Sequence, residues 1–424
     1  MISESLYFGI QRLRGGVTPR MIDRAEALLD QSWGEIREYV KDRLEKNYDV
    51  AVHDGLLWLR DQPIRDKGSY RERWEDSAGR VPWGSHKRRT SGSTGKPFTF
   101  PRDRTMLAWM DAAMWAVYRW YGIGPGDRMA RFWGRPLSGL SAVKRRLADV
   151  VLRQRRMNAF EVTPERSRAF FNGLSDWDPK WAYGYPSLMR EFAEHLRADG
   201  IDGRPLGLEV VITTGELLDR ATRESLSDFF GCPVVNEYGC SESGILAFEC
   251  STGRSHAIPV AAFPEVKGDD SAGKGVQEGP LLITDLYGET MPFVRYSLED
   301  EVRLHPPEEC ACGRELPCLE VLAGRTDSFI RRPDGTEIYD AVLAYSVPSG
   351  VCQFQVRQTD LHRLYGQVVV EDGHEESDVV EECRRVWSEA LGPEMEVEVE
   401  VVDGISRNSS GKRRYFIPLD TTTP

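Results

Sequence analysis

The amino-acid sequence predicts an α/β protein made of a large N-terminal domain, in which helices flank β-sheets, and a small α+β C-terminal domain. A chain of 424 residues is longer than one hydrophobic core normally serves, so at least two domains are expected. In the middle of the chain, apolar stretches end in glycine-containing turns that lead into helical patterns. After Asp327 the pattern changes to short strands with one helix, which places the domains at 1–326 and 327–424.

The first 80 residues are predicted to be helical, because apolar residues recur at helical spacing in 23–29, 33–44 and 57–59. No chemistry is visible in this lead-in, which is expected to pack against the domain that follows. Another helix is predicted over 106–120, where Trp, Met and Ala recur with the same period. That stripe is typical of a core helix.

A loop rich in glycine and hydroxyl residues, RTSGSTGKP at 89–97, precedes that helix. Its backbone N–H groups, its hydroxyls and a lysine ammonium can all face phosphate oxygens. Its glycine spacing and the proline after the lysine distinguish it from a Walker A loop, and 98–100 predicts a strand. From these residues alone, a flexible surface turn is the alternative. The residues assigned to phosphate are Thr90, Ser91, Gly92, Ser93, Thr94, Gly95 and Lys96.

Three segments in the middle of the chain, 181–187, 209–216 and 233–242, each predict a strand that ends in a turn and is followed by a helix. Helices are predicted at 188–197 and 220–229. This alternation favours a mostly parallel sheet with helices on its faces. Because ligands of such sheets bind beside the carboxyl ends of strands, the turn residues are expected to line one crevice. These residues are Gly215, Glu216, Tyr238 and Glu242.

The last third of the chain is predicted to be rich in strands. Two short strands are expected at 279–285 and 291–296, before the domain boundary. The small domain is expected to contain strands at 352–358, 367–370 and 396–402 and one helix at 378–391.

Composition narrows the range of functions. Hydrophobic residues make up 40% of the chain and charged residues 29%, as in an ordinary soluble protein. A formal net charge of −12 argues against non-specific binding to nucleic acid or to an anionic membrane. No secretion signal and no membrane-spanning apolar window are visible. With eight cysteines, such a chain is expected to hold reduced thiols in the cytoplasm.

Four of the residues with thiol or imidazole side chains suggest a metal site. Cys250 with His256, and Cys310 with Cys312, supply the ligand set of a closed tetrahedral zinc site. Four protein ligands leave no open position, so the zinc is expected to be structural. Cys318 is an alternative ligand. The other interpretation is that these are ordinary buried cysteines and a surface histidine.

Five motifs occur in order along the chain and resemble those of the acyl-adenylate-forming ligase superfamily. They are the loop at 90–96, EYGCSE at 237–242, RYSLED at 295–300, GRTD at 324–327 and SRNSSGK at 406–412. The resemblance spans 89–412, roughly three quarters of the chain. More narrowly, the chain is similar to the branch that contains phenylacetate–CoA ligase and its relatives in polysaccharide and natural-product gene clusters.

The resemblance implies the roles of the nucleotide-binding residues. Tyr238 would stack on adenine, Ser241 would contact the α-phosphate, and Glu242 would hold Mg²⁺. Asp300 would accept both ribose hydroxyls, and Arg325 would lie near the ribose. The implied nucleotide site also contains Gly215, Glu216, Glu237 and Gly239.

The resemblance also implies the catalytic residues and a mobile small domain. Lys412 would bridge the incoming carboxylate and the α-phosphate while negative charge develops. Asp327 would be the pivot on which the domain that carries this lysine turns. Lys96 and Glu242 complete the implied catalytic set.

The implied function is ATP-dependent activation of a carboxylic acid as acyl-AMP, with release of pyrophosphate, followed by acyl transfer to the thiol of CoA. The segment 333–340 departs from the family's usual continuation after the hinge, so an amine or a carrier-protein thiol stays an alternative acceptor. A nucleotide-binding relative without catalytic activity is the alternative from another class. Candidate acid-pocket residues are Trp133, Tyr183 and Tyr185, whose aromatic rings favour an aryl or other flat acid.

Overall fold

The structure is a computed structural model of the 424-residue chain. It describes residues 2–48, 55–76, 81, 83, 85–89, 98–133, 139–158, 162–267, 275–323, 329–407 and 414–419. The chain divides into two units, which are described separately: unit 1 holds 1–126 and 237–321, and unit 2 holds 127–236 and 322–424. The domain boundary expected at Asp327 lies outside the described residues and stays a prediction.

The N-terminal lead-in of unit 1 is helical, as predicted. Its helices are α1 (Ile2–Arg14), α2 (Pro19–Leu29), α3 (Trp33–Tyr48), α4 (Gly55–Asp61) and α5 (Lys67–Asp76). Thr18 caps α2, because its side-chain oxygen accepts a hydrogen bond from the amide of Met21. The guanidinium of Arg43 on α3 lies 4.0 Å from the centre of the Tyr287 ring, which joins the lead-in to the rest of the unit.

Unit 1 is built on antiparallel strands. Its large sheet runs in the order β10 (Ala262–Val266), β11 (Gln277–Asp285), β12 (Tyr296–His305), β13 (Cys318–Ala323), β9 (Ser255–Ala257), β8 (Gly244–Glu249) and β7 (Val234–Cys240). A separate hairpin of β1 (Ser85–Arg89) and β2 (Thr99–Asp103) flanks the predicted phosphate loop. The core helix α6 (Arg104–Tyr118) and the 3₁₀ turn η1 (Arg119–Tyr121) follow, in agreement with the predicted helix.

Two predictions for this unit are wrong. Residues 291–295 are not a strand, because the amide of Phe293 donates to the buried carboxylate of Asp285 and Arg295 has a positive φ of 44°. The segment 233–242 is not followed by a helix, because the turn at 241–243 leads directly into antiparallel β8. A mostly parallel sheet is therefore the wrong description of unit 1.

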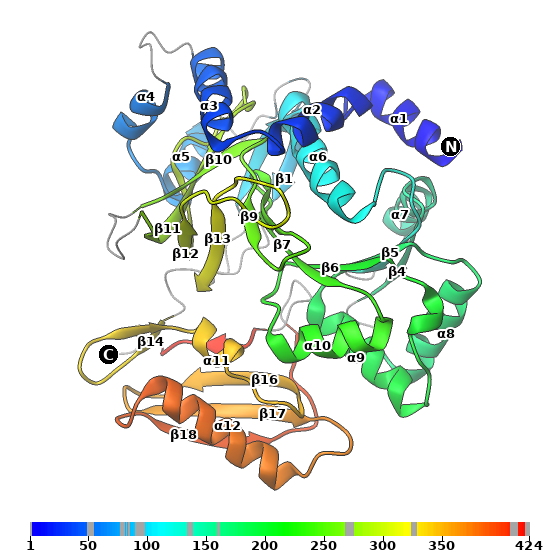
Figure 1. The fold of residues 1–424 in the computed structure, drawn as a ribbon, viewed down its shortest axis with the longest axis vertical. Helices are drawn as coiled ribbons and strands as arrows, with labels where there is room; N and C mark the ends of the chain where they lie inside the picture. Colours follow the sequence, from blue (N-terminus) through cyan, green and yellow to red (C-terminus); the bar gives the residue numbers. More distant parts are fainter. Residues whose placement is uncertain are drawn as a thin grey trace. The chain divides into compact units, whose positions relative to one another are not determined.

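The first part of unit 2 has the parallel arrangement that was predicted. Its strands run in the order β6 (Val210–Thr214), β5 (Trp181–Gly184), β3 (Met129–Phe132) and β4 (Gln154–Met157), and the neighbours in this row are parallel. Beside them lie α7 (Gly139–Val151), α8 (Pro164–Ser175), α9 (Pro186–Ala198), the 3₁₀ turn η2 (Arg204–Leu206) and α10 (Arg220–Phe230), with α9 packed between α8 and α10 (Figure 1).

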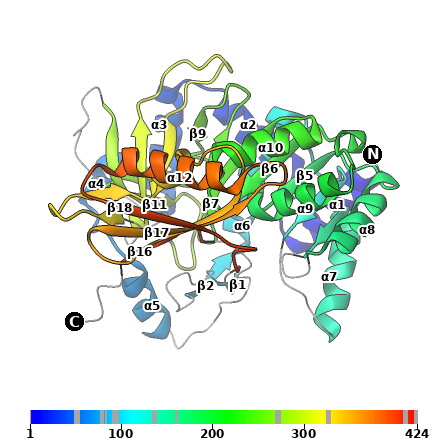
Figure 2. The same ribbon diagram turned by 90° about the horizontal axis from the view of Figure 1, so that it is seen from below.

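The C-terminal part of unit 2 has the predicted α+β character. A hairpin of β14 (Phe329–Arg331) and β15 (Glu337–Tyr339) and helix α11 (Ala341–Tyr345) precede a sheet in the order β18 (Glu396–Val401), β17 (Arg363–Val370), β16 (Val351–Gln358) and β19 (Phe416–Ile417). Helix α12 (Glu376–Leu391) lies across one face of this sheet (Figure 1 and Figure 2). Its Trp387 is fully buried and lies so close to Gly366 of β17 that a Cβ there would meet the indole at 2.7 Å.

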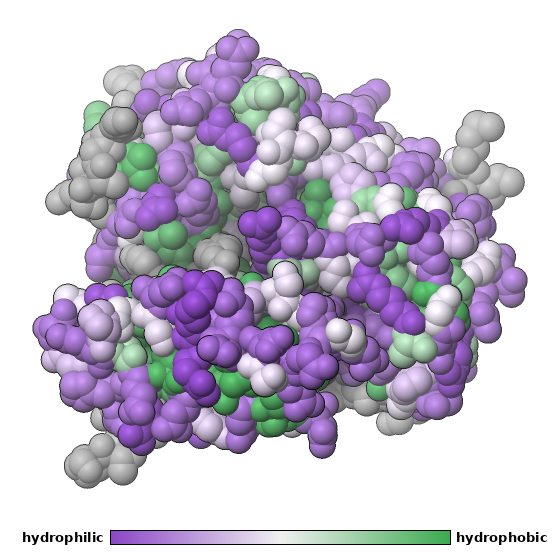
Figure 3. All heavy atoms as spheres, turned by 60° about the horizontal axis from the view of Figure 1, so that its bottom comes forward, coloured by the Kyte–Doolittle hydropathy of each residue, from purple (hydrophilic) through white to green (hydrophobic). Residues whose placement is uncertain are grey.

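None of the described helices is both long and apolar enough to cross a bilayer. On the face drawn in Figure 3, hydrophobic residues are confined to patches among hydrophilic ones.

Candidate functional site

The turn between β7 and β8 carries the candidate magnesium ligand. Glu242 lies in this turn and is only 7% exposed. Its carboxylate Oε1 accepts a hydrogen bond from the hydroxyl of Tyr296 at 3.3 Å. Burial, with the Glu242 charge adding to it, raises the pKa of Tyr296, so this hydroxyl stays a donor. The remaining lone pairs of the Glu242 carboxylate suit a hard cation.

The predicted adenine and ribose residues lie together in unit 1. The hydroxyl of Tyr238, near the end of β7, donates to the carboxylate Oδ2 of Asp300 on β12 at 2.5 Å. The two motifs EYGCSE and RYSLED are therefore in contact through the residues assigned to the nucleoside. Because both side chains are partly buried, the ring and the carboxylate have fixed positions beside each other.

Two further residues of EYGCSE have clear structural reasons for their identity. Glu237 is buried and accepts a hydrogen bond from the hydroxyl of Tyr118 on α6. At Gly239 a Cβ would lie 2.5 Å from the carbonyl oxygen of Gly244, so only glycine lets β7 and β8 approach this closely. Ser241 is half-buried in the same turn as Glu242.

The other predicted site residues belong to unit 2. Gly215 follows β6 with a positive φ of 78°, and the Glu216 carboxylate accepts a hydrogen bond from the amide of Ser187 at the start of α9. The candidate acid-pocket residues gather into one aromatic cluster. The Trp133 ring stacks on those of Tyr185 and Tyr183, with centroid distances of 4.2 and 5.8 Å. Tyr185 is buried in the core of the unit, whereas Trp133 and Tyr183 are partly exposed.

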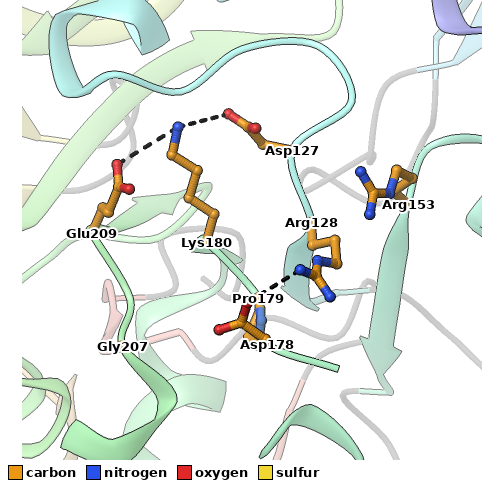
Figure 4. A pocket seen from close by; sticks show the side chains of 8 residues that line it. All are labelled: Asp127, Arg128, Arg153, Asp178, Pro179, Lys180, Gly207 and Glu209. Atoms are coloured by element: carbon orange, nitrogen blue, oxygen red, sulfur yellow. Dashed lines mark hydrogen bonds and ion pairs between the residues drawn. The ribbon is translucent and has the colours of Figure 1, made fainter. Parts of the chain in front are cut away.

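A cavity of about 330 Å³ in unit 2 is lined by none of the predicted site residues (Figure 4). It lies at the amino ends of β3, β4, β5 and β6, and ligands of parallel sheets bind at the carboxyl ends. Its charged groups pair with one another: Lys180 Nζ lies 3.1 Å from Asp127 and 3.7 Å from Glu209. The lining residues are Asp127, Arg128, Arg153, Asp178, Pro179, Lys180, Gly207 and Glu209.

The predicted zinc ligands come together in unit 1. The donor atoms of Cys250, His256, Cys310 and Cys312 all lie within 4.8 Å of one another. The Sγ atoms of Cys250 and Cys310 are 3.9 Å apart, and Cys312 Sγ is 3.4 Å from His256 Nε2. Zinc bonds of about 2.0–2.3 Å in a tetrahedron require donor separations of roughly 3.5–3.8 Å. The cluster therefore has the size of a zinc site, and its histidine is fully buried rather than on the surface.

Hydrogen bonding within the cluster favours the form of sulfur that binds metal. Burial raises the pKa of the Cys250 thiol, but hydrogen bonds with His256 and Thr252 outweigh burial and lower it to about 5. Cys318 lies at the other ring nitrogen, with its Sγ 3.8 Å from His256 Nδ1 and 3.2 Å from the Nε of Arg254. Cys318 therefore lies outside the group of four donors, beside the ring nitrogen that Cys312 does not contact, and its role as a substitute ligand stays a prediction.

A pattern missed in the sequence explains how the cysteines are presented. The segments CSTGR at 250–254 and CACGR at 310–314 form the same turn, in which the fourth residue donates back to the carbonyl of the first. In each turn this residue is a glycine with a positive φ, 80° for Gly253 and 85° for Gly313. Comparing the chain with itself over five-residue windows would have revealed the repeat.

Several predicted site residues lie outside the described residues. They are the phosphate-loop residues 90–96, Arg325, Asp327 and Lys412. Their assignments stay predictions from the sequence.

Comparison with known proteins supplies independent findings. Residues 332–418 match the family of the CapK C-terminal domain. Protein CapK of Staphylococcus aureus is 20% identical over 335 residues, which are 77% of this chain and 73% of CapK. Phenylacetate-coenzyme A ligase of Aromatoleum evansii is 29% identical over 165 residues, 37% of this chain and 36% of the ligase.

Solved structures share the fold. A 2-hydroxyisobutyryl-CoA ligase in the postadenylation state, in complex with R3-HIB-AMP, has a TM-score of 0.67 at 18% identity, covering 94% of this chain and 88% of the ligase. An anthranilate CoA ligase in complex with anthranoyl-AMP has a TM-score of 0.53 at 13% identity, covering 76% and 64%. The fold is thus that of the adenylate-forming ligases.

The sequence matches to CapK and to two phenylacetate-coenzyme A ligases agree with the resemblance to the phenylacetate–CoA ligase-like branch.

Proposed function

We propose that this protein is an AMP-forming acid ligase, which activates a carboxylic acid with ATP and transfers the acyl group to CoA. The observation that carries the proposal is the group of residues beside the β7–β8 turn. There Tyr238 contacts Asp300, and the Glu242 carboxylate is buried beside Tyr296. The relatives named above as CoA ligases, two of them with an acyl-AMP bound, support the same reaction class.

In this proposal the residues of unit 1 bind and orient ATP. The Tyr238 ring stacks on adenine, and the Asp300 carboxylate accepts the ribose hydroxyls. Glu242 binds Mg²⁺, which offsets the triphosphate charge when it is bound. The loop at 90–96 holds the β- and γ-phosphates with its amides and with Lys96.

The chemistry then has two steps. An oxygen of the acid attacks the α-phosphorus, the bond to the bridging oxygen breaks, and pyrophosphate leaves. The resulting mixed anhydride is a far better electrophile than the carboxylate, because AMP is a good leaving group. The acceptor thiol attacks the acyl carbonyl and AMP departs. Lys412 offsets the charge that develops in the first step.

The substrates are proposed from the chemistry of unit 2. The stacked rings of Trp133, Tyr183 and Tyr185 favour a flat or aryl acid. CoA is the proposed acceptor, with an amine or a carrier-protein thiol as the alternative, because the hairpin turn between β14 and β15 departs from the family pattern.

A cytoplasmic location fits eight free cysteines and the use of ATP.

ATP–pyrophosphate exchange tests this function. With a panel of aryl, hydroxy and aliphatic acids, at least one acid should drive Mg²⁺-dependent exchange. Adding CoA, amines or a carrier protein to the responsive acid then identifies the acceptor by which of them releases AMP. If ATP binds but no acid supports exchange, the protein is a nucleotide-binding relative without ligase activity.

We also propose that Cys250, His256, Cys310 and Cys312 bind one structural zinc ion. The four donors all lie within 4.8 Å of one another and would fill all four positions of a tetrahedral ion, which leaves none for a substrate. The ion would hold the two matching turns together and stabilise the segment between β8 and β13.

A further inference from the structure

Beneath the candidate nucleotide site, unit 1 contains an ion pair that is entirely buried. Arg102 on β2 is 1% exposed and Asp285 at the end of β11 is 0% exposed. The guanidinium donates two hydrogen bonds to the carboxylate, Nη1 to Oδ2 at 2.5 Å and Nη2 to Oδ1 at 3.3 Å. It also lies over the Phe293 ring, 4.3 Å from its centre. A buried pair of this kind contributes little net stability compared with apolar residues, so a role beyond stability is worth seeking.

Two further hydrogen bonds of the pair lead to the turn that holds Glu242. The third donor of Arg102, Nε, bonds to the main-chain carbonyl of Glu242 at 2.7 Å. The hydroxyl of the next residue, Ser243, donates to Asp285 Oδ1 at 2.8 Å. The Glu242 carbonyl and the side chain of the residue after it are therefore both bonded to the same pair, while the Glu242 carboxylate bonds to Tyr296.

The Asp285 carboxylate also fixes the segment that leads to the RYSLED motif. The amide of Phe293 donates to Asp285 Oδ2 at 2.8 Å, and the chain continues from there to Tyr296 at the start of β12. Arg102 itself belongs to the strand that follows the predicted phosphate loop at 90–96. One pair thus joins the three segments to which the nucleotide is assigned.

We propose that Arg102, Asp285 and Ser243 are positioning residues that set the Glu242 carboxylate for binding magnesium with ATP. The inference rests on the proposed function, since it takes Glu242 as the magnesium ligand. The pair never touches ATP in this scheme. It acts by holding the main chain of Glu242. Among the described residues, the Glu242 carboxylate has a single protein hydrogen bond, to Tyr296. Because its main chain is held, this carboxylate does not have to be reoriented when the cation arrives.

Two conservative substitutions test the inference. Ser243→Ala removes one hydrogen bond to Asp285 and little volume. Arg102→Lys keeps a cation beside Asp285 but cannot also bond to the Glu242 carbonyl. Ser227→Ala is the matched control, because it removes one side-chain bond, to the carbonyl of Cys232, in unit 2. The Mg²⁺ concentration for half-maximal response is measured at saturating ATP, both by ATP–pyrophosphate exchange and by thermal stabilisation.

Ser243→Ala should raise the Mg²⁺ midpoint about fivefold, the scale of one buried hydrogen bond, and Arg102→Lys should raise it further. Exchange at saturating Mg²⁺ should fall much less than the midpoint shifts. Ser227→Ala should leave the Mg²⁺ midpoint unchanged, even if it lowers the melting temperature as much as Ser243→Ala does. Unchanged midpoints in both test variants, with a normal response in the wild type, overturn the inference. A wild type that shows no Mg²⁺ response overturns the proposed function itself.

Discussion

Glu265 on β10 gives a prediction about pH that follows from its surroundings in unit 1. Its carboxylate Oε1 lies 3.7 Å from the Nε of Arg295, and both side chains are mostly buried. Within the described part of the chain, its Oε2 has no hydrogen-bond partner. Burial therefore dominates over the attraction of Arg295 and raises the pKa of Glu265 from 4.5 to about 7.

The sign and size of the effect on stability follow from that shift. In the unfolded chain Glu265 ionises near pH 4.5, whereas in the folded protein it keeps its proton until about pH 7. The folded state is therefore favoured most below the unfolded pKa, and stability declines as the pH rises from about 4.5 to 7. A shift of this size corresponds to about 3 kcal/mol over that interval. Glu265→Gln removes the titration and with it the decline.

The assay is urea unfolding of wild type and Glu265→Gln at pH 5 and at pH 8. The variant should gain about 2.5 kcal/mol relative to wild type between the two pH values, because Gln stays neutral. Glu38→Gln, at an exposed ion pair with Lys41 on α3, is the control and should show no such change. Equal pH dependence of wild type and Glu265→Gln would show that water or a structural rearrangement solvates this carboxylate, and would refute the reasoning.

Three further predictions concern the proposed function and metal. Lys412→Ala should leave ATP binding intact and slow acyl-AMP formation on the order of a hundredfold or more, and an unchanged rate would exclude Lys412 as the catalytic lysine. Protein purified without chelators should contain about one zinc ion per chain, and Cys310→Ser should lower the melting temperature and the zinc content, whereas Cys232→Ser should keep the zinc. Asp327→Pro should impair one of the two half-reactions, pyrophosphate release or acyl transfer, far more than the other, and equal slowing of both would place the hinge elsewhere.

Local patterns in the sequence were sufficient to predict most elements. The helical lead-in, α6, α9, α10 and α12 carry their apolar residues at helical spacing, and the structure confirms them. The failure at 291–296 has a different origin. That stretch is apolar enough for a strand, but its conformation is decided by a hydrogen bond from Phe293 to Asp285, which no local pattern encodes.

The candidate site was predictable only where a motif carries it. Tyr238 and Asp300 are 62 residues apart and were assigned to one site by resemblance, not by spacing or periodicity. Arg102 has no such signal, because in the sequence PRDR it resembles an ordinary surface arginine and its partner lies 183 residues further on. The metal cluster lies between these cases. Its residue types were informative, but the placing of Cys318 outside the cluster needed coordinates.

The two matching turns that present Cys250 and Cys310 have a consequence for oxidation. Their sulfur atoms are 3.9 Å apart, and the hydroxyl of Thr252 lies 3.1 Å from the first and 3.2 Å from the second. In air, stripping the proposed zinc ion with a chelator would let oxygen take two electrons and two protons from these thiols, which gives hydrogen peroxide and a disulfide. That bond would close a loop of about 60 residues and constrain the unfolded chain. Metal-free protein prepared in air should then unfold at a higher temperature than the same protein kept under a reductant.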